Sequence, residues 1–134
     1  MILGEFIKDE NGNNHKMSGI LPFRSKKSKL SVGYRYIEGL KDTPIIKQSQ
    51  LIRGHEFHYW EIENNLGKFN LKKGEHHQSF PSPWKIKSWE TEYKNEGMFD
   101  SKLHASWIHL HLPSSPEVAR NFINATQIDY SQNS

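Results

Sequence analysis

Apolar and polar residues alternate along several segments of the chain, which is the pattern of a β-strand with one buried face. The alternation is clearest at residues 30–39, 53–60 and 103–112, and the last of these (LHASWIHLHL) is the most strand-like run in the sequence. Shorter strands are predicted at residues 17–22 and 84–89. The pattern therefore predicts a structure built mainly of strands.

One helix is predicted near the C-terminus. Ser114 and Glu117 can form a capping box, or Ser115 can cap a helix that begins at Pro116. Four apolar residues follow at helical spacing: Val118, Ala119, Phe122 and Ile123. We expect one amphipathic helix packed on the sheet, with a frayed tail over residues 127–134.

Polar segments separate these elements. Residues 8–16 and 24–29 are predicted to be loops, and the basic residues of the second are expected to be solvated because no aromatic ring lies among them to stack on a nucleic-acid base. Residues 61–83 are rich in Asn, Gly, Lys, Glu and His, which predicts a surface excursion with one strand at residues 68–71. The folded part is thus expected to span residues 1–126, interrupted by this excursion.

The composition limits the hydrophobic core. The 134 residues suffice for one domain, but Leu, Ile, Val and Phe account for only 31 of them, close to the roughly 20% below which disorder becomes common. A net charge of +3 gives no support for a nucleic-acid partner. No apolar run approaches the roughly 18 residues of a membrane span, and the first residues do not resemble a signal peptide. We therefore expect a cytoplasmic protein without membrane contact and with a thin core.

Eight histidines are present, and two groups of them can carry chemistry. Alternate residues of a strand share a face, so His109 and His111 are expected on one face of their strand, and Glu56 and His58 on one face of another. Three hypotheses follow. The residues can form a metal site from His109 and His111 with Glu56 or His58, line a polar cleft as hydrogen-bonded imidazoles, or provide a general base for a nucleophile.

The absence of cysteine bears on the third hypothesis. The chain has no thiol nucleophile, no disulfide and no thiolate metal site. No serine lies in a Gly-x-Ser-x-Gly elbow either. A histidine base in this chain therefore lacks a recognisable nucleophile beside it.

The order of the motifs is similar to that of one enzyme family. The motifs are, in chain order, MSGILP at residues 17–22, GYR at 33–35, RGHEFHY at 53–59, EG at 96–97, ASWIHLH at 105–111 and SSPE at 114–117. With them the sequence resembles the C-terminal glutaminase domain of the cobyrinic acid a,c-diamide synthases over nearly its whole length, apart from residues 61–83 and the last few.

The resemblance implies a fold and roles for four residues. The family's glutaminase domain is a class I glutamine amidotransferase-like α/β sandwich, of which this chain would be the strand-rich C-terminal half with a C-terminal helix. His109 falls at the position of the catalytic histidine, which activates a cysteine that attacks glutamine. His111 falls where other class I glutaminases carry the glutamate that orients this base. Glu56 and His58 match motif positions expected to line the glutamine pocket or to brace the strand.

The resemblance also implies partners that the chain does not contain. The family amidates the a and c carboxylates of a corrin ring with ammonia from glutamine, and uses ATP and magnesium in an N-terminal synthetase domain. We expect this chain to bind no cofactor itself. Residues 1–4 (MILG) match the end of the cysteine motif, so the cysteine would lie four residues before Met1.

The chain is accordingly expected to be a truncated part of such a synthase and to be inactive alone. Two alternatives stay open. The chain can be a non-catalytic subunit that completes a partner chain carrying the synthetase domain and the cysteine, or a small His-rich metal-binding protein.

Overall fold

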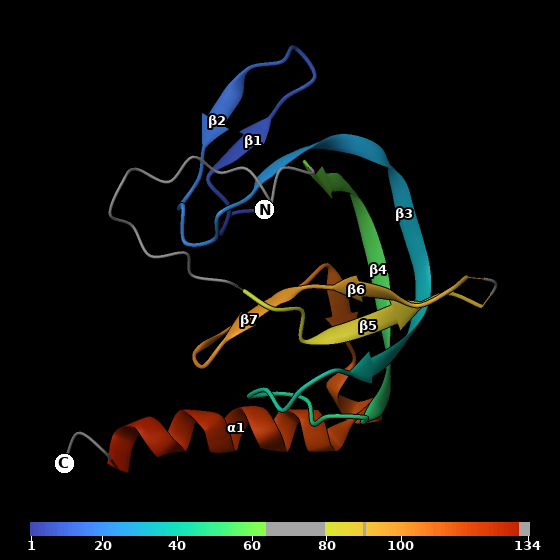
Figure 1. Ribbon diagram of the computed structural model, residues 1–134, viewed down its shortest axis with the longest axis vertical. Helices are drawn as coiled ribbons and strands as arrows, with labels where there is room; N and C mark the ends of the chain where they lie inside the picture. Colours follow the sequence, from blue (N-terminus) through green and yellow to red (C-terminus); the bar gives the residue numbers. More distant parts are fainter. Residues whose placement is uncertain (64–79, 90, 132–134) are drawn as a thin grey trace. The chain divides into compact units, whose positions relative to one another are not determined.

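The computed structural model describes residues 1–63, 80–89 and 91–131. The chain divides into two compact units: Met1–Ser31 with His58–Gln78 form unit 1, and Val32–Phe57 with Ser79–Ser134 form unit 2. Two long strands, β3 (Arg24–Gly39) and β4 (Leu51–Ile62), contribute residues to both units and pair with each other (Figure 1).

Unit 1 is built on a hairpin. Strand β1 (Phe6–Lys8) pairs antiparallel with β2 (Asn14–Lys16) and parallel with the beginning of β3, where Phe6 lies opposite Arg24. The predicted loop at residues 8–16 thus contains a strand, because three of its residues continue the pairing of β1 on the far side of the turn.

Two further predictions for unit 1 are wrong. Residues 17–22 form no strand: Gly19 has a φ of 68°, a left-handed conformation that interrupts extended backbone. Residues 24–29 are not a loop but the first part of β3, where Ser25 is fully buried. The basic side chains of this strand are matched by carboxylates, since Lys26 pairs with Glu61 at 3.2 Å and Lys27 pairs with Glu10.

Unit 2 contains most of the buried apolar side chains. In it β3 pairs antiparallel with β5 (Trp84–Lys87), β5 with β6 (Lys94–Glu96), and β4 with β9 (Ile108–Leu110). A separate hairpin joins β7 (Met98–Asp100) to β8 (Leu103–Ala105). The predicted strands at residues 30–39 and 53–60 are confirmed within β3 and β4, and the one predicted at 84–89 is confirmed as far as Lys87. The core cluster of this unit consists of Ile37, Ile46, Ile52, Trp84, Ile86, Ile108 and Val118.

The strand predicted at residues 103–112 is broken into two. Strand β8 ends at Ala105 and β9 begins at Ile108, because Ser106 and Trp107 bend away to donate hydrogen bonds to the Glu96 carboxylate. The break falls directly before His109. His111 lies beyond β9, at the start of a short 3₁₀ helix, η1 (Leu112–Ser114).

The predicted C-terminal helix is confirmed as α1 (Pro116–Ser131), which begins directly after the buried Ser115. It continues past residue 126, where the tail was expected, because no glycine or proline follows Pro116 to end it. Val118 joins the core, whereas Phe122 and Ile123 are more than half exposed, so only part of the predicted apolar face is packed.

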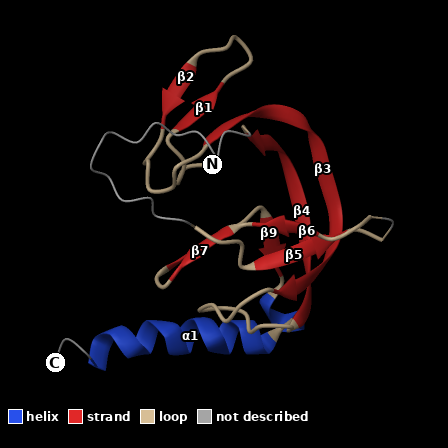
Figure 2. Ribbon diagram, viewed as in Figure 1, coloured by secondary structure: helices blue, strands red, loops and turns tan. Residues whose placement is uncertain are grey.

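The parallel and antiparallel pairings with one long helix confirm an α/β class with a mixed sheet (Figure 2). The first two residues of the expected excursion, 61 and 62, belong to β4, and most of the rest lies outside the described residues. The strand expected at residues 68–71 lies outside the described residues. No described helix has the length and apolar character that a membrane crossing requires.

Candidate functional site

The pairing of β4 with β9 determines which histidines lie together. In this antiparallel pair Gly54 lies opposite Leu110, His55 opposite His109, and Glu56 opposite Ile108. Directly opposed residues project from the same face of a sheet. His55 and His109 therefore share one face, while Glu56 and Ile108 project into the buried side, where both are less than a tenth exposed.

A pocket of about 660 Å³ opens over the paired histidines. His109 and His111 both line it, so the structure brings these two predicted site residues together. We call it the histidine pocket, and its lining residues are Tyr34, Arg35, Tyr36, Arg53, Gly54, His55, His109, His111 and Ser114.

Short-range contacts fix several of these side chains and their backbone. The His111 carbonyl accepts hydrogen bonds from the Ser114 amide at 3.0 Å and from the Ser114 hydroxyl at 2.7 Å, which secures the chain where it leaves β9. The Tyr34 ring meets the His55 ring edge-on, with centroids 5.4 Å apart. The Arg53 guanidinium lies 5.4 Å from the centre of the Tyr36 ring.

The histidine pocket is lined by hydrogen-bond donors and lacks acidic side chains. Arg53 contributes a guanidinium, three imidazoles line the pocket, and none of its lining residues is an aspartate or glutamate. Such a lining favours a ligand with a carboxylate or another anionic group.

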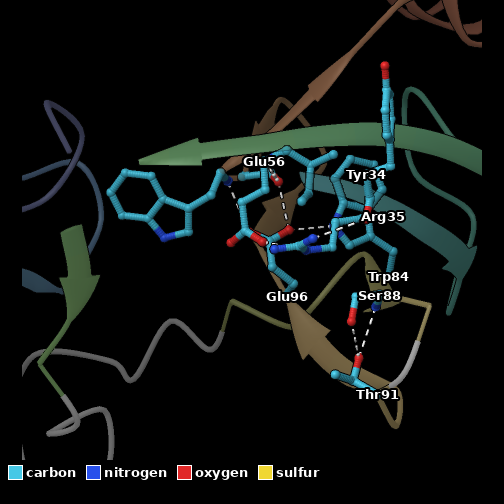
Figure 3. Close-up of polar contacts among 10 residues, drawn as sticks. Tyr34, Arg35, Glu56, Trp84, Ser88, Thr91 and Glu96 are labelled. Atoms are coloured by element: carbon cyan, nitrogen blue, oxygen red, sulfur yellow. Dashed lines mark hydrogen bonds and ion pairs between the residues drawn. The ribbon is translucent and has the colours of Figure 1, made fainter. Parts of the chain in front are cut away.

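Glu56 is not among the lining residues, but it holds one of them. Its Oε2 atom accepts a hydrogen bond from Nε of Arg35 at 2.6 Å, in an ion pair whose side chains are only 12% exposed for Arg35 and 3% for Glu56 (Figure 3). A guanidinium tied to a buried carboxylate keeps a defined position. The pair lies on the buried side of the sheet, so it braces β3 against β4 beneath the pocket and does not present a charge to it.

His58 does not join this group. It belongs to the part of β4 in unit 1 and is not a lining residue of the histidine pocket. In the described part of the chain, no three His, Asp or Glu side chains are placed to hold a metal ion together. The metal set of His109 and His111 with Glu56 or His58 is therefore not assembled there.

Glu96 positions the strand that carries His109. Its carboxylate accepts hydrogen bonds from Nε1 of Trp84 at 2.6 Å, from the Ser106 hydroxyl at 2.6 Å and from the Trp107 amide at 2.9 Å (Figure 3). The Ser106 oxygen in turn accepts the Ile108 amide at 2.7 Å. One side chain of β6 thus accepts three hydrogen bonds, one from β5 and two from the residues that directly precede β9.

Close packing between β4 and β9 depends on Gly54. A Cβ atom at this position would lie 2.2 Å from Cγ2 of Ile108, far inside van der Waals contact. A larger residue would therefore push β9, and His109 with it, away from β4.

Sequence reasoning missed two lining residues that matter chemically, Arg53 and His55, and also Arg35, the buried partner of Glu56. Alternation along residues 53–60 does place His55 and Glu56 on opposite faces. The register of β4 against β9, which sets His55 beside His109, connects residues more than fifty positions apart and has no local signal.

Comparison with known proteins defines the relatives of the chain. No family model matches it. A cobyrinate a,c-diamide synthase of Syntrophotalea carbinolica is 29% identical over 132 residues, which cover 92% of the chain. One of Gloeobacter violaceus is 30% identical over 125 residues, again 92% of the chain. The chain is a sequence relative of the a,c-diamide synthases.

The similarity to these synthases is strongest locally. A hydrogenobyrinate a,c-diamide synthase of Mesorhizobium japonicum is 44% identical over 64 residues, or 46% of the chain. The resemblance inferred from the motifs is thus confirmed. The chain spans about a quarter of the length of the two cobyrinate a,c-diamide synthases, 26% and 24% respectively.

Proposed function

We propose that the chain supplies the histidine base of the glutaminase of an a,c-diamide synthase in cobalamin biosynthesis. The names of the relatives specify the formation of two amides on cobyrinate or hydrogenobyrinate. The observation that carries the proposal is the histidine pocket, in which the β4–β9 pairing sets His109 beside His55 and which His111 also lines. On this proposal the mixed sheet and α1 are part of a glutamine amidotransferase-like sandwich.

His109 acts on a cysteine of the synthase portion that this chain does not match. Its imidazole takes the thiol proton, and the thiolate attacks the side-chain carbonyl carbon of glutamine. The C–N bond breaks, ammonia leaves with the proton that His109 returns, and a γ-glutamyl thioester forms. Water, deprotonated by the same imidazole, then hydrolyses the thioester to glutamate and the free thiol. His111 orients the base.

The lining of the histidine pocket supports glutamine as the ligand. A glutamine molecule carries a carboxylate, and Arg53 and the imidazoles provide the donors that a carboxylate needs. The volume of about 660 Å³ lies within the range of small-molecule sites. Glu56 contributes indirectly, because its buried ion pair with Arg35 braces the two strands beneath the pocket.

ATP and magnesium do not fit the residues of this chain. Its sequence has no Gly-rich phosphate loop of the G-x-x-x-x-G-K-[ST] type, and its described part has no group of three side chains suited to a metal ion. We therefore assign the activation of the corrin a and c carboxylates to the unmatched portion of the synthase. Without that portion and its cysteine, the chain has no glutaminase activity.

The test is a chimera in which this chain replaces the matching quarter of the Syntrophotalea carbinolica synthase. His109→Ala is expected to lower glutamine-dependent amidation by at least the ~10²-fold typical of a lost general base. Amidation at high ammonium should stay near the parent rate, because ammonia then needs no glutaminase. His15→Ala, which changes an exposed histidine of unit 1, should leave both rates unchanged.

One result with His109→Ala would contradict the proposal. If His109→Ala abolishes both activities while the chimera keeps its folded circular dichroism spectrum, His109 serves the synthetase chemistry or a shared structural element. The assignment of a glutaminase base would then be wrong.

A further inference from the structure

The face of the sheet beside the histidine pocket is covered with aromatic and basic side chains. We call it the basic–aromatic face and define it by Tyr34 and Tyr36 of β3, Arg53 of β4, Lys87 of β5, and Trp89 and Tyr93 of the turn that follows β5. All six belong to unit 2.

Register and ring contacts show that these side chains share one face. Tyr36 lies opposite Lys87, whereas the neighbouring pair Ile37 and Ile86 is fully buried on the other side. The Tyr36 ring is 6.4 Å from the Trp89 ring and 5.4 Å from the Arg53 guanidinium. Nζ of Lys87 lies 4.8 Å from the centre of the Tyr93 ring. The contacts thus run continuously from β4 to the turn after β5.

The exposure of this face is unusual for aromatic and aliphatic side chains. Trp89 is 83% exposed, Tyr34 78%, and the adjacent Leu51 of β4 71%. Between the rings lies a hollow of about 440 Å³ that Leu51, Trp89 and Tyr93 line together with Lys87. Contiguous exposed apolar surface of this kind marks binding surfaces, and Trp, Tyr and Arg are the residues enriched at the energetic centres of protein interfaces.

The charge of the face is positive. Lys85 is paired with Glu38 at 3.0 Å, but among the described residues neither Arg53 nor Lys87 has a carboxylate partner; each lies on a ring instead. The complementary surface therefore carries carboxylates.

The position of the histidine pocket indicates which partner the basic–aromatic face contacts. Tyr34, Tyr36 and Arg53 line the histidine pocket and also form the near edge of the basic–aromatic face. This sequence has no cysteine, so on the proposed function the thiol on which His109 acts belongs to a portion of the synthase outside this sequence, and that portion lies against the mouth of the pocket. The surface that borders the mouth is the basic–aromatic face.

We infer that the basic–aromatic face is the docking surface for the cysteine-bearing portion of the synthase, through a patch of acidic and apolar side chains. This inference rests on the proposed function, and it adds the surface at which this chain meets the cysteine-bearing portion. The aliphatic Leu51 and the hollow beside Trp89 favour a protein over a nucleic acid, because a single strand would use stacked rings and cations but would not fill an aliphatic hollow.

Hydroxyl-radical footprinting of the isolated chain and of the chimera described above tests the inference. In the chimera the oxidation rates of Trp89 and Tyr34 should fall several-fold relative to the isolated chain. Phe122 of α1, 57% exposed and outside the face, provides the internal reference. Unchanged rates at Trp89 and Tyr34, or protection of Phe122 alone, would overturn the inference.

Variants separate this inference from the proposed base. Trp89→Ala with Lys87→Glu should restore rapid oxidation of Tyr34 in the chimera, and the exposed Arg120→Glu on α1 should not. The His109→Ala chimera should keep the protection, so that loss of the base and loss of docking give different results.

A separate experiment tests whether the basic–aromatic face binds a nucleic acid instead. The isolated chain is titrated with a thymidine oligonucleotide and footprinted again. No protection of Trp89 is expected. Saturable protection by the oligonucleotide, with none in the chimera, would replace the protein partner by a single-stranded nucleic acid.

Discussion

His104 is a buried titratable residue that lies apart from the histidine pocket. Its ring packs on that of Trp84 with centroids 4.4 Å apart, and neither ring nitrogen has a hydrogen-bond partner among the described residues. Burial lowers the pKa of His104 to about 4. The folded state therefore holds this imidazole neutral, whereas the unfolded state takes up a proton below its ordinary pKa of 6.5.

This difference makes stability depend on pH. The free energy of unfolding has its full value with respect to His104 above pH 6.5. It falls by at most about 3 kcal/mol as the pH drops towards 4, because the unfolded state takes up the proton first. Replacing His104 by Leu should remove this part of the dependence, measured as the difference in urea unfolding free energy between pH 7 and pH 5. Asp9, with a pKa of about 2, does not titrate in this range when folded. Equal pH dependence in the two proteins would contradict the assignment.

The buried ion pair of Arg35 with Glu56 also affects stability. Because Glu56 is 3% exposed, removing Arg35 leaves a buried carboxylate without this ion-pair partner. Arg35→Met should therefore destabilise the protein by about 3–5 kcal/mol. The double variant Arg35→Met, Glu56→Leu should recover much of this loss, because it removes the buried charge as well. The measurement is a double-mutant cycle in urea, and additive losses would show that the pair is not coupled.

At the scale of elements, local alternation predicted the strands that lie mostly in unit 2, because their buried faces are continuous with the core of Ile37, Ile52 and Ile86. It failed where a distant partner decides the backbone. Residues 24–29 become a strand because β1 and the carboxylates of Glu10 and Glu61 match them. His109 and His111 could be named from motifs, but their neighbour His55 depends on the β4–β9 register.

The hydrogen bonds at the break before β9 predict that Glu96 holds this strand in position. The Glu96 carboxylate gathers three donors around Ser106 and Trp107, and charge-assisted hydrogen bonds of this kind are worth about 1.5–3 kcal/mol each. Glu96→Ala should release β9 from its position and raise the amide exchange rates of Ile108 and His109 strongly. Glu92→Ala, which changes an exposed neighbour, is the matched control. Unchanged exchange at His109 would mean that β4 alone holds β9.

At the scale of the whole molecule, the two units are stabilised by different interactions. Among the described residues, unit 1 buries only Leu21 and Phe23 as large apolar side chains, whereas the seven-residue core cluster lies in unit 2. Unit 1 relies on exposed ion pairs, including Lys26 with Glu61 and Arg24 with Glu5 at 3.6 Å. Exposed pairs contribute about 0–1 kcal/mol each, so the thin core expected from the composition is concentrated in one unit.

Hydrogen exchange should separate the units. Peptides from residues 1–31 are expected to exchange at a lower opening free energy than peptides from residues 32–57, because little apolar surface must be exposed to open unit 1. Raising NaCl to about 0.5 M should accelerate exchange in residues 1–31, since salt screens exposed charges over a few ångströms. The same salt should leave residues 32–57 unchanged or better protected, because burial of apolar side chains does not depend on ion pairing. Uniform exchange along the chain, at both salt concentrations, would show that the two units unfold as one and that the ion pairs of unit 1 are incidental to its stability.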